Sequence, residues 1–165
     1  MKVEFDVNLT EKDIFRFNIC QAYKGVQGLL STIFPLFVIA VAVYNYKNAG
    51  LGSTMVYIMV GIFLIVYLPV SLWLRSKKVY RTSESLSNTL HFTFTEENIS
   101  VSQGEQQVEF QWENIYKMIA TGKMVLIYTN RIHAYIIPRV QIQEFYGELA
   151  VLAKSKLERF RIRMK

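Results

Sequence analysis

Between Asp13 and Glu84 the chain contains no carboxylate, and Lys47 divides the centre of this block into two uncharged stretches. The stretches cover residues 25–46 and 48–74, so each has the ~20 apolar residues needed to cross ~30 Å of hydrocarbon. Both are apolar on all sides, whereas the core helix of a soluble protein normally keeps a polar face. The sequence therefore predicts a helical transmembrane hairpin within residues 11–80, with spans at about 26–46 and 53–74.

The basic residues around this block predict its orientation. Only Lys47 lies in the connecting loop, whereas Lys12, Arg16 and Lys24 precede the first span and four cations follow the second. By the positive-inside rule, we expect a multi-pass protein of the cell (inner) membrane with both termini in the cytoplasm. A polar segment of 24 residues precedes the first apolar run, which argues against a signal peptide.

The four cations after the second span are the predicted membrane-surface contacts. An anionic inner leaflet attracts each such residue by ~1 kcal/mol. The same pattern is also typical of topology anchoring without specific recognition of a lipid. The four residues are Arg75, Lys77, Lys78 and Arg81.

The sequence changes period after the second span. Alternating runs separated by Asn- and Gly-containing turns predict six short antiparallel strands. These runs are LHFTFT, ISVS, QVEFQW, NIYKMIA, MVLIYT and HAYIIP. Pro138 suits the entry of a helix, and an apolar stripe follows it at three- and four-residue spacing. The stripe is Val140, Ile142, Phe145, Leu149, Leu152, Leu157 and Phe160, and the basic end LAKSKLERFRIRMK is expected to fray.

The first residues also alternate, with Val3, Phe5 and Val7 on one face. A lone strand needs a partner, so residues 1–10 are expected to join the sheet of a cytoplasmic domain at 81–165. Thr10 can cap the helix that follows, and Asp13 can favour its positive end. The predicted fold is an α+β membrane protein. It combines a transmembrane hairpin with a seven-stranded antiparallel sheet or barrel and one C-terminal amphipathic helix, the plan of a pleckstrin-homology-like (PH-like) domain.

Four runs of the sequence resemble the YcxB-like family of small bacterial membrane proteins. They are FTFTEENISV, FQWENIYKMI, MVLIYT and AYIIPRVQI, in the order and spacing of that family. The resemblance implies two transmembrane helices before a PH-like C-terminal domain, and it implies no biochemical activity. By analogy alone, bacterial PH-like membrane proteins are sometimes linked to resistance to antimicrobial peptides. Trp112 and Ile115 are expected to fill the core of the sheet, and Arg139 to lie at the solvated surface.

Few residues in the chain are suited to catalysis. His91 and His133 have no Cys or Asp at ligand spacing, and nothing in the sequence places either one beside Asp6 or Asp13, the only aspartates. No glycine-rich phosphate loop occurs, and Glu96 and Glu97 fit a solvated turn. We therefore expect no enzyme activity, no metal and no cofactor. Cys20 is expected to be a reduced thiol.

Three functional interpretations remain open. The first is a membrane-anchored binding module that recruits a protein partner or senses the membrane surface. The second is an accessory or structural subunit of a membrane complex that protects against membrane-active peptides. The third is an oligomeric transporter or pore, which the absence of ionisable residues in the spans disfavours.

The expected partners are the lipid bilayer with its anionic inner leaflet, a protein, or a second copy of the chain. The small residues Gly28, Ser31, Thr32 and Gly61 would give the spans close helix contacts, and Pro35 and Pro69 would kink them. Nucleic acid is not expected, because the net charge of +6 arises at the membrane flanks and the C-terminal end.

Overall fold

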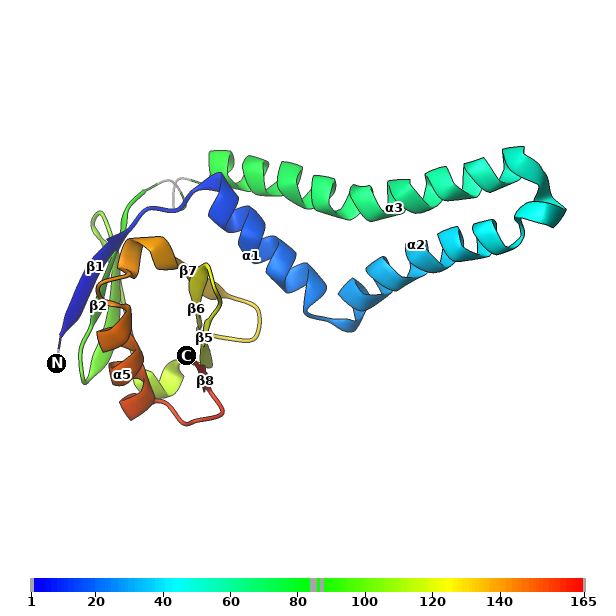
Figure 1. Cartoon of the computed structure of the whole chain (residues 1–165). Helices are drawn as coiled ribbons and strands as arrows, with labels where there is room; N and C mark the ends of the chain where they lie inside the picture. Colours follow the sequence, from blue (N-terminus) through cyan, green and yellow to red (C-terminus); the bar gives the residue numbers. More distant parts are fainter. Residues whose placement is uncertain (1, 84–85, 87, 165) are drawn as a thin grey trace. The chain divides into compact units, whose positions relative to one another are not determined.

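The computed structural model describes residues 2–83, 86 and 88–164 (Figure 1). Met1, Glu84, Ser85, Ser87 and Lys165, which belong to the predicted domains 1–10 and 81–165, lie outside the described residues. The chain divides into two compact units, one of Met1–Asp13 with Tyr80–Lys165 and one of Ile14–Val79. The first unit is thus built from both ends of the chain, and the helical unit lies between them in sequence.

Helix α1 (Glu11–Tyr23) begins where the sequence predicts a cap. The Thr10 backbone N–H donates to Oδ2 of Asp13 at 3.1 Å, and the Asp13 backbone N–H donates to Oγ1 of Thr10 at 3.3 Å. The side chain of each residue thereby accepts a hydrogen bond from the backbone N–H of the other, as in a capping box. The predicted cap is confirmed.

Two long apolar helices follow, α2 (Val26–Tyr44) and α3 (Tyr46–Thr82). Gly50 interrupts α3 with a φ of 75° and a ψ of 166°, a conformation that only glycine adopts readily. The predicted span at 53–74 lies inside the part of α3 after this break. Thr54 Oγ1 donates to the Gly50 carbonyl oxygen at 2.9 Å, which satisfies a carbonyl at the interruption.

Length and composition make one described helix a candidate membrane span, Gly50–Thr82. The segment Gly28–Tyr44 qualifies only together with Glu11–Tyr23, as a pair bent by 75°. The described residues therefore contain one candidate span, and a second one if the bent pair is taken as a single span. This finding supports a membrane helix but does not by itself establish the predicted two-span hairpin. Large apolar side chains on both helices point outward, among them Phe37 at 63% and Phe63 at 64% exposure. Such a surface suits lipid far better than water.

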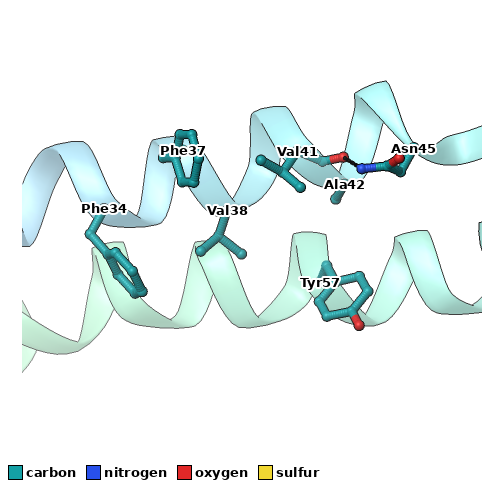
Figure 2. Close-up of a pocket in the computed structure, with 7 residues that line it drawn as sticks. All are labelled: Phe34, Phe37, Val38, Val41, Ala42, Asn45 and Tyr57. Atoms are coloured by element: carbon teal, nitrogen blue, oxygen red, sulfur yellow. Dashed lines mark hydrogen bonds between the residues drawn. The ribbon is translucent and has the colours of Figure 1, made fainter.

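Helices α2 and α3 run side by side (Figure 2). Gly61 lies at their closest approach, because a Cβ atom there would meet Ile39 Cγ1 and lie 3.3 Å from the Pro35 carbonyl oxygen. The hydroxyls of Ser31 and Thr32 both donate to the Gly28 carbonyl oxygen of their own helix. Of the predicted small residues, Gly61 is therefore the one that brings these two helices together.

The first sheet has the strand order β1-β2-β3-β4. Its strands are β1 (Val3–Val7), β2 (Leu90–Phe94), β3 (Asn98–Gln103) and β4 (Gln106–Gln111). Strand β1 pairs antiparallel with β2, which confirms that the N-terminal strand joins the sheet. Phe5 lies opposite Phe92, and its ring centroid is 5.8 Å from that of Phe92 and 5.6 Å from that of Phe94. This aromatic cluster forms one side of the core.

The second sheet has the order β7-β6-β5-β8. Its strands are β5 (Lys117–Ala120), β6 (Met124–Tyr128), β7 (Ala134–Pro138) and β8 (Ile162–Arg163). The short helix η1 (Trp112–Asn114) separates the two sheets along the chain. Trp112 and Ile115 are buried as predicted, and the Trp112 indole N–H donates to the Thr95 carbonyl oxygen at 3.0 Å.

The prediction of one antiparallel sheet of seven strands is wrong in two respects. The described strands form two four-stranded sheets that do not close into a barrel. The C-terminal residues, predicted to fray, supply β8, which runs parallel to β5. Strand β8 could not be predicted because it has only two residues, Ile162 and Arg163, which is too short for an alternating pattern to appear in the basic tail.

The C-terminal helix is shorter than predicted. Pro138 ends β7, opposite Met124, and is followed by the 3₁₀ helix η2 (Arg139–Ile142) and then by α5 (Tyr146–Lys156). Ile142, Leu149 and Leu152 are buried, whereas Val140 and Phe160 of the predicted stripe are exposed. The stripe therefore joins residues from a 3₁₀ helix, an α-helix and the segment after it.

Candidate binding site

A groove opens between the two sheets because they do not close. Strand β4 is the last strand of the first sheet and β7 is the first of the second, so among the described strands each has a neighbour on one side only. Both border one cavity of about 310 Å³, which we call the edge groove. Its lining residues are Leu9, Leu86, Leu90, Val101, Gln103, Gln106, Val108, Ala134, Tyr135 and Ile136.

The described lining of the edge groove is apolar and uncharged. Leu90, Val101 and Ile136 are buried in its floor, and the side-chain amides of Gln103 and Gln106 add hydrogen-bonding groups. At its rim, Val108 of β4 is 47% exposed. An edge strand also presents unpaired backbone N–H and C=O groups to an incoming chain. The arrangement can accept an extended peptide by strand addition.

Tyr135 of β7 connects the edge groove to the aromatic core. Its ring meets Phe92 edge-on at 5.9 Å and Phe110 at 5.8 Å between centroids. Burial raises the pKa of the Tyr135 hydroxyl above its usual value of 10.0. Tyr135 therefore joins both sheets at the groove and stays neutral at physiological pH.

The predicted membrane-surface residues all lie on the last turns of α3. Arg75 and Lys78 are exposed, and the Lys77 ammonium lies 5.3 Å from the centroid of the Trp73 ring, one helical turn earlier. Arg81 Nε is 3.3 Å from Oε1 of Glu11. Lys77 and Arg81 thus have partners within the chain, and contact of the four cations with a membrane surface stays a prediction.

One histidine lies beside an aspartate on the outer face of the first sheet, which the sequence did not indicate. Asp6 and His91 are direct partners across β1 and β2, and Nδ1 of His91 is 2.6 Å from Oδ1 of Asp6. Ser102 lies opposite His91 on β3. Both members of the Asp6–His91 pair are exposed, so they lack the sheltered environment in which serine nucleophiles are activated. His133 lies in the turn before β7, with Nδ1 3.0 Å from Asn130 Nδ2.

The other candidate residues are in ordinary environments. Glu96 and Glu97 are exposed in the turn between β2 and β3. Arg139, predicted to be solvated, stacks its guanidinium 4.1 Å from the centroid of the Tyr146 ring. Cys20 is half-buried with a free thiol. No group of three or more His, Cys, Asp or Glu side chains within the described residues could hold a metal ion.

The helical unit contains a cavity of about 480 Å³ between α2 and α3 (Figure 2). Phe34, Phe37 and Val38 line one end of it, and Asn45 and Tyr57 supply the polar groups at the other. The amide of Asn45, the residue after α2, donates to the Val41 carbonyl oxygen of that helix at 3.3 Å. A lining of this kind fits hydrocarbon better than a hydrated ion.

The edge groove was not predicted from the sequence. One signal was present, because β4 (QQVEFQ) carries polar residues at positions 106, 107, 109 and 111 and is exposed on both faces. Such a strand is typical of a sheet edge. That β7 would be the facing edge depends on the order of strands in the second sheet, which the alternation does not specify.

Comparison with known proteins gives one match. The family model described as YcxB-like protein matches residues 94–146, which confirms the resemblance over that range. The matched range runs from the end of β2 to the start of α5 and contains both edge strands of the groove. Neither the curated proteins nor the solved structures include a match.

Proposed function

With residues 94–146 assigned to the YcxB-like family, we propose that this chain is a non-catalytic membrane protein that recruits a protein partner. The helical unit anchors the chain in the inner membrane. The sheet unit lies on the cytoplasmic side and binds an extended segment of the partner in the edge groove.

The observation that carries this proposal is the pair of edge strands around one apolar floor. Each backbone hydrogen bond to an added strand contributes a net ~0.5–1.5 kcal/mol, so a few bonds and one or two buried side chains give a reversible complex. The lining holds two amides and no charge among its described residues, so the preferred segment is uncharged where it enters the groove.

The anchoring part of the proposal is supported by the candidate span Gly50–Thr82 and by the distribution of charge. The loop with Lys47 has one cation, whereas Arg75, Lys77, Lys78 and Arg81 follow the apolar part of α3. This asymmetry favours a cytoplasmic sheet unit and membrane-surface contact by the four cations.

Photocrosslinking from the full-length protein in its native membrane tests the docking proposal. A photoreactive residue in place of Gln106, which lines the groove, should crosslink to one extended segment of an identified protein. Val108→Arg in the same chain should reduce that crosslink at least ~10-fold, since it places a charge at the rim of an apolar site. The measurement is the yield and the mapped position of the crosslinked peptide.

The matched control is Val151→Arg on α5, where the valine is 62% exposed and lies outside the groove. This variant should keep the crosslink at its full yield. If Val108→Arg and Val151→Arg gave equal yields, or if the crosslinked peptides were scattered over many proteins, the docking proposal would be wrong.

A further inference from the structure

A second pocket lies in the sheet unit, where β5, β8 and the end of α5 meet. Its volume is about 680 Å³, and we call it the C-terminal pocket. The described residues that line it are Ile119, Ala120, Lys154, Leu157, Arg159, Ile162, Arg163 and Met164. None of them belongs to the edge groove.

The C-terminal segment is held in place by its own contacts. The Met118 backbone N–H donates to the Arg161 carbonyl oxygen at 2.8 Å, which starts the parallel pairing of β5 with β8. The Arg161 guanidinium donates to the Glu113 carbonyl oxygen at 3.1 Å and lies 3.5 Å from Glu158 Oε2. Met164 is buried. Arg161 and Glu158 thus pair with each other, and these contacts order the C-terminal segment that forms one wall of the pocket.

The lining combines a cationic rim with an aliphatic floor. Lys154, Arg159 and Arg163 are exposed, and none of the described lining residues is acidic. Ile119, Leu157, Ile162 and Met164 supply the apolar part. Arginine binds phosphate through paired N–H donors, and an aliphatic floor binds a hydrocarbon chain. The complementary ligand carries negative charge at one end and hydrocarbon at the other.

We propose that the C-terminal pocket binds an anionic phospholipid, with its phosphate at Lys154, Arg159 and Arg163 and the start of an acyl chain on the aliphatic floor. An acidic peptide is less well suited, because β8 covers the edge of β5 at Met118 and Ile119, and a peptide strand could add only beside the two-residue β8. The proposal depends on the membrane location proposed above but not on docking in the edge groove. On this proposal, bound lipid stabilises the C-terminal segment of the sheet unit.

Hydrogen–deuterium exchange of the full-length protein in phosphatidylcholine nanodiscs tests this proposal. Dihexanoyl-phosphatidylglycerol should slow exchange in residues 154–164, whereas dihexanoyl-phosphatidylcholine should not. The double variant Arg159→Gln/Arg163→Gln should weaken the response at least ~10-fold, since each lost charge-assisted contact contributes about that factor. Raising the salt concentration should weaken it further, because the three cations are exposed.

The control variant Lys123→Gln/Arg131→Gln removes the same charge from exposed turns and should respond like the original chain. Unchanged exchange of β2 and β3 without lipid shows that each variant is folded, and Lys154→Gln provides a second test outside β8. Equal responses of the two double variants would overturn the proposal. Equal protection by inorganic phosphate would show that the pocket binds phosphate without an acyl chain. Protection by a Glu-rich peptide instead of the lipid would show that the pocket binds a protein. Because Val108→Arg leaves this pocket intact, failure here is distinguishable from failure of docking.

Discussion

At the scale of single residues, the aromatic contacts of Tyr135 join the two sheets at the rim of the edge groove. The ring contacts one aromatic from β2 and another from β4, and the phenol is half-buried. A buried phenol resists ionisation because the phenolate would lose hydration. Well below pH 10 the group is neutral in the folded and the unfolded chain, so it adds no pH dependence to stability there.

Tyr135 predicts a specific response to alkaline pH. Above pH 10 the unfolded chain loses this proton before the folded chain does, so the free energy of unfolding should fall as the pH rises. Replacing Tyr135 with Phe should remove a phenolate signal that appears above pH 10, measured as the difference in absorbance at the phenolate band between the two proteins. If this absorbance difference between the two proteins had its midpoint at or below pH 10, the burial of the Tyr135 hydroxyl would be contradicted.

The Asp6–His91 pair illustrates what single residues in a sequence do not reveal. The two side chains lie 85 positions apart and meet because β1 pairs with β2 in one particular register. A shift by one position would turn Asp6 to the other face of the sheet. The alternation of Val3, Phe5 and Val7 indicates which face is buried, but it does not specify the partner residues.

At the scale of elements, the sequence indicates where the strands and helices lie better than how they are joined. All six predicted strands between residues 89 and 138 occur, and β1 pairs as predicted. The order of strands, the gap between β4 and β7 and the parallel β8 depend on contacts between distant segments, which local periodicity does not encode. The candidate site could not be predicted for the same reason, since the edge groove is a property of the strand order.

The contact between α2 and α3 predicts a difference between two glycines of the same helix. Gly61→Val should lower the stability of the helical unit by about 1–3 kcal/mol, because the new side chain would collide with Ile39 and the Pro35 carbonyl. Gly52→Val is the matched control, since a Cβ atom there meets nothing within 4 Å. The measurement is unfolding of the full-length protein in mixed micelles with increasing sodium dodecyl sulfate. Equal losses for the two variants would show that Gly61 is not at a close helix contact.

At the scale of the whole molecule, a discontinuous sheet unit and a helical unit share one chain. The family match lies entirely in the sheet unit, at residues 94–146, whereas the membrane assignment depends on the composition of the helical unit. The proposed topology of the helical unit can therefore be tested without any knowledge of the partner.

The proposed topology predicts opposite accessibility for two positions. In a chain with Cys20→Ser, the only cysteine of the sequence is removed. In that background Lys47→Cys should react with a membrane-impermeant maleimide added to intact cells, and Lys2→Cys should react only after the membrane is opened. Labelling of both positions from outside, or of neither, would exclude a hairpin with cytoplasmic termini.

The pairing of β1 with β2 also sets an order of events during synthesis. Strand β1 leaves the ribosome before its partner β2, which follows only after the whole helical unit. Until then Val3, Phe5 and Val7 have no core to enter, and contacts between such distant segments form slowly. Synthesis of the whole helical unit must therefore precede completion of the first sheet. During this interval chaperones or proteases can reach the unpaired β1 segment.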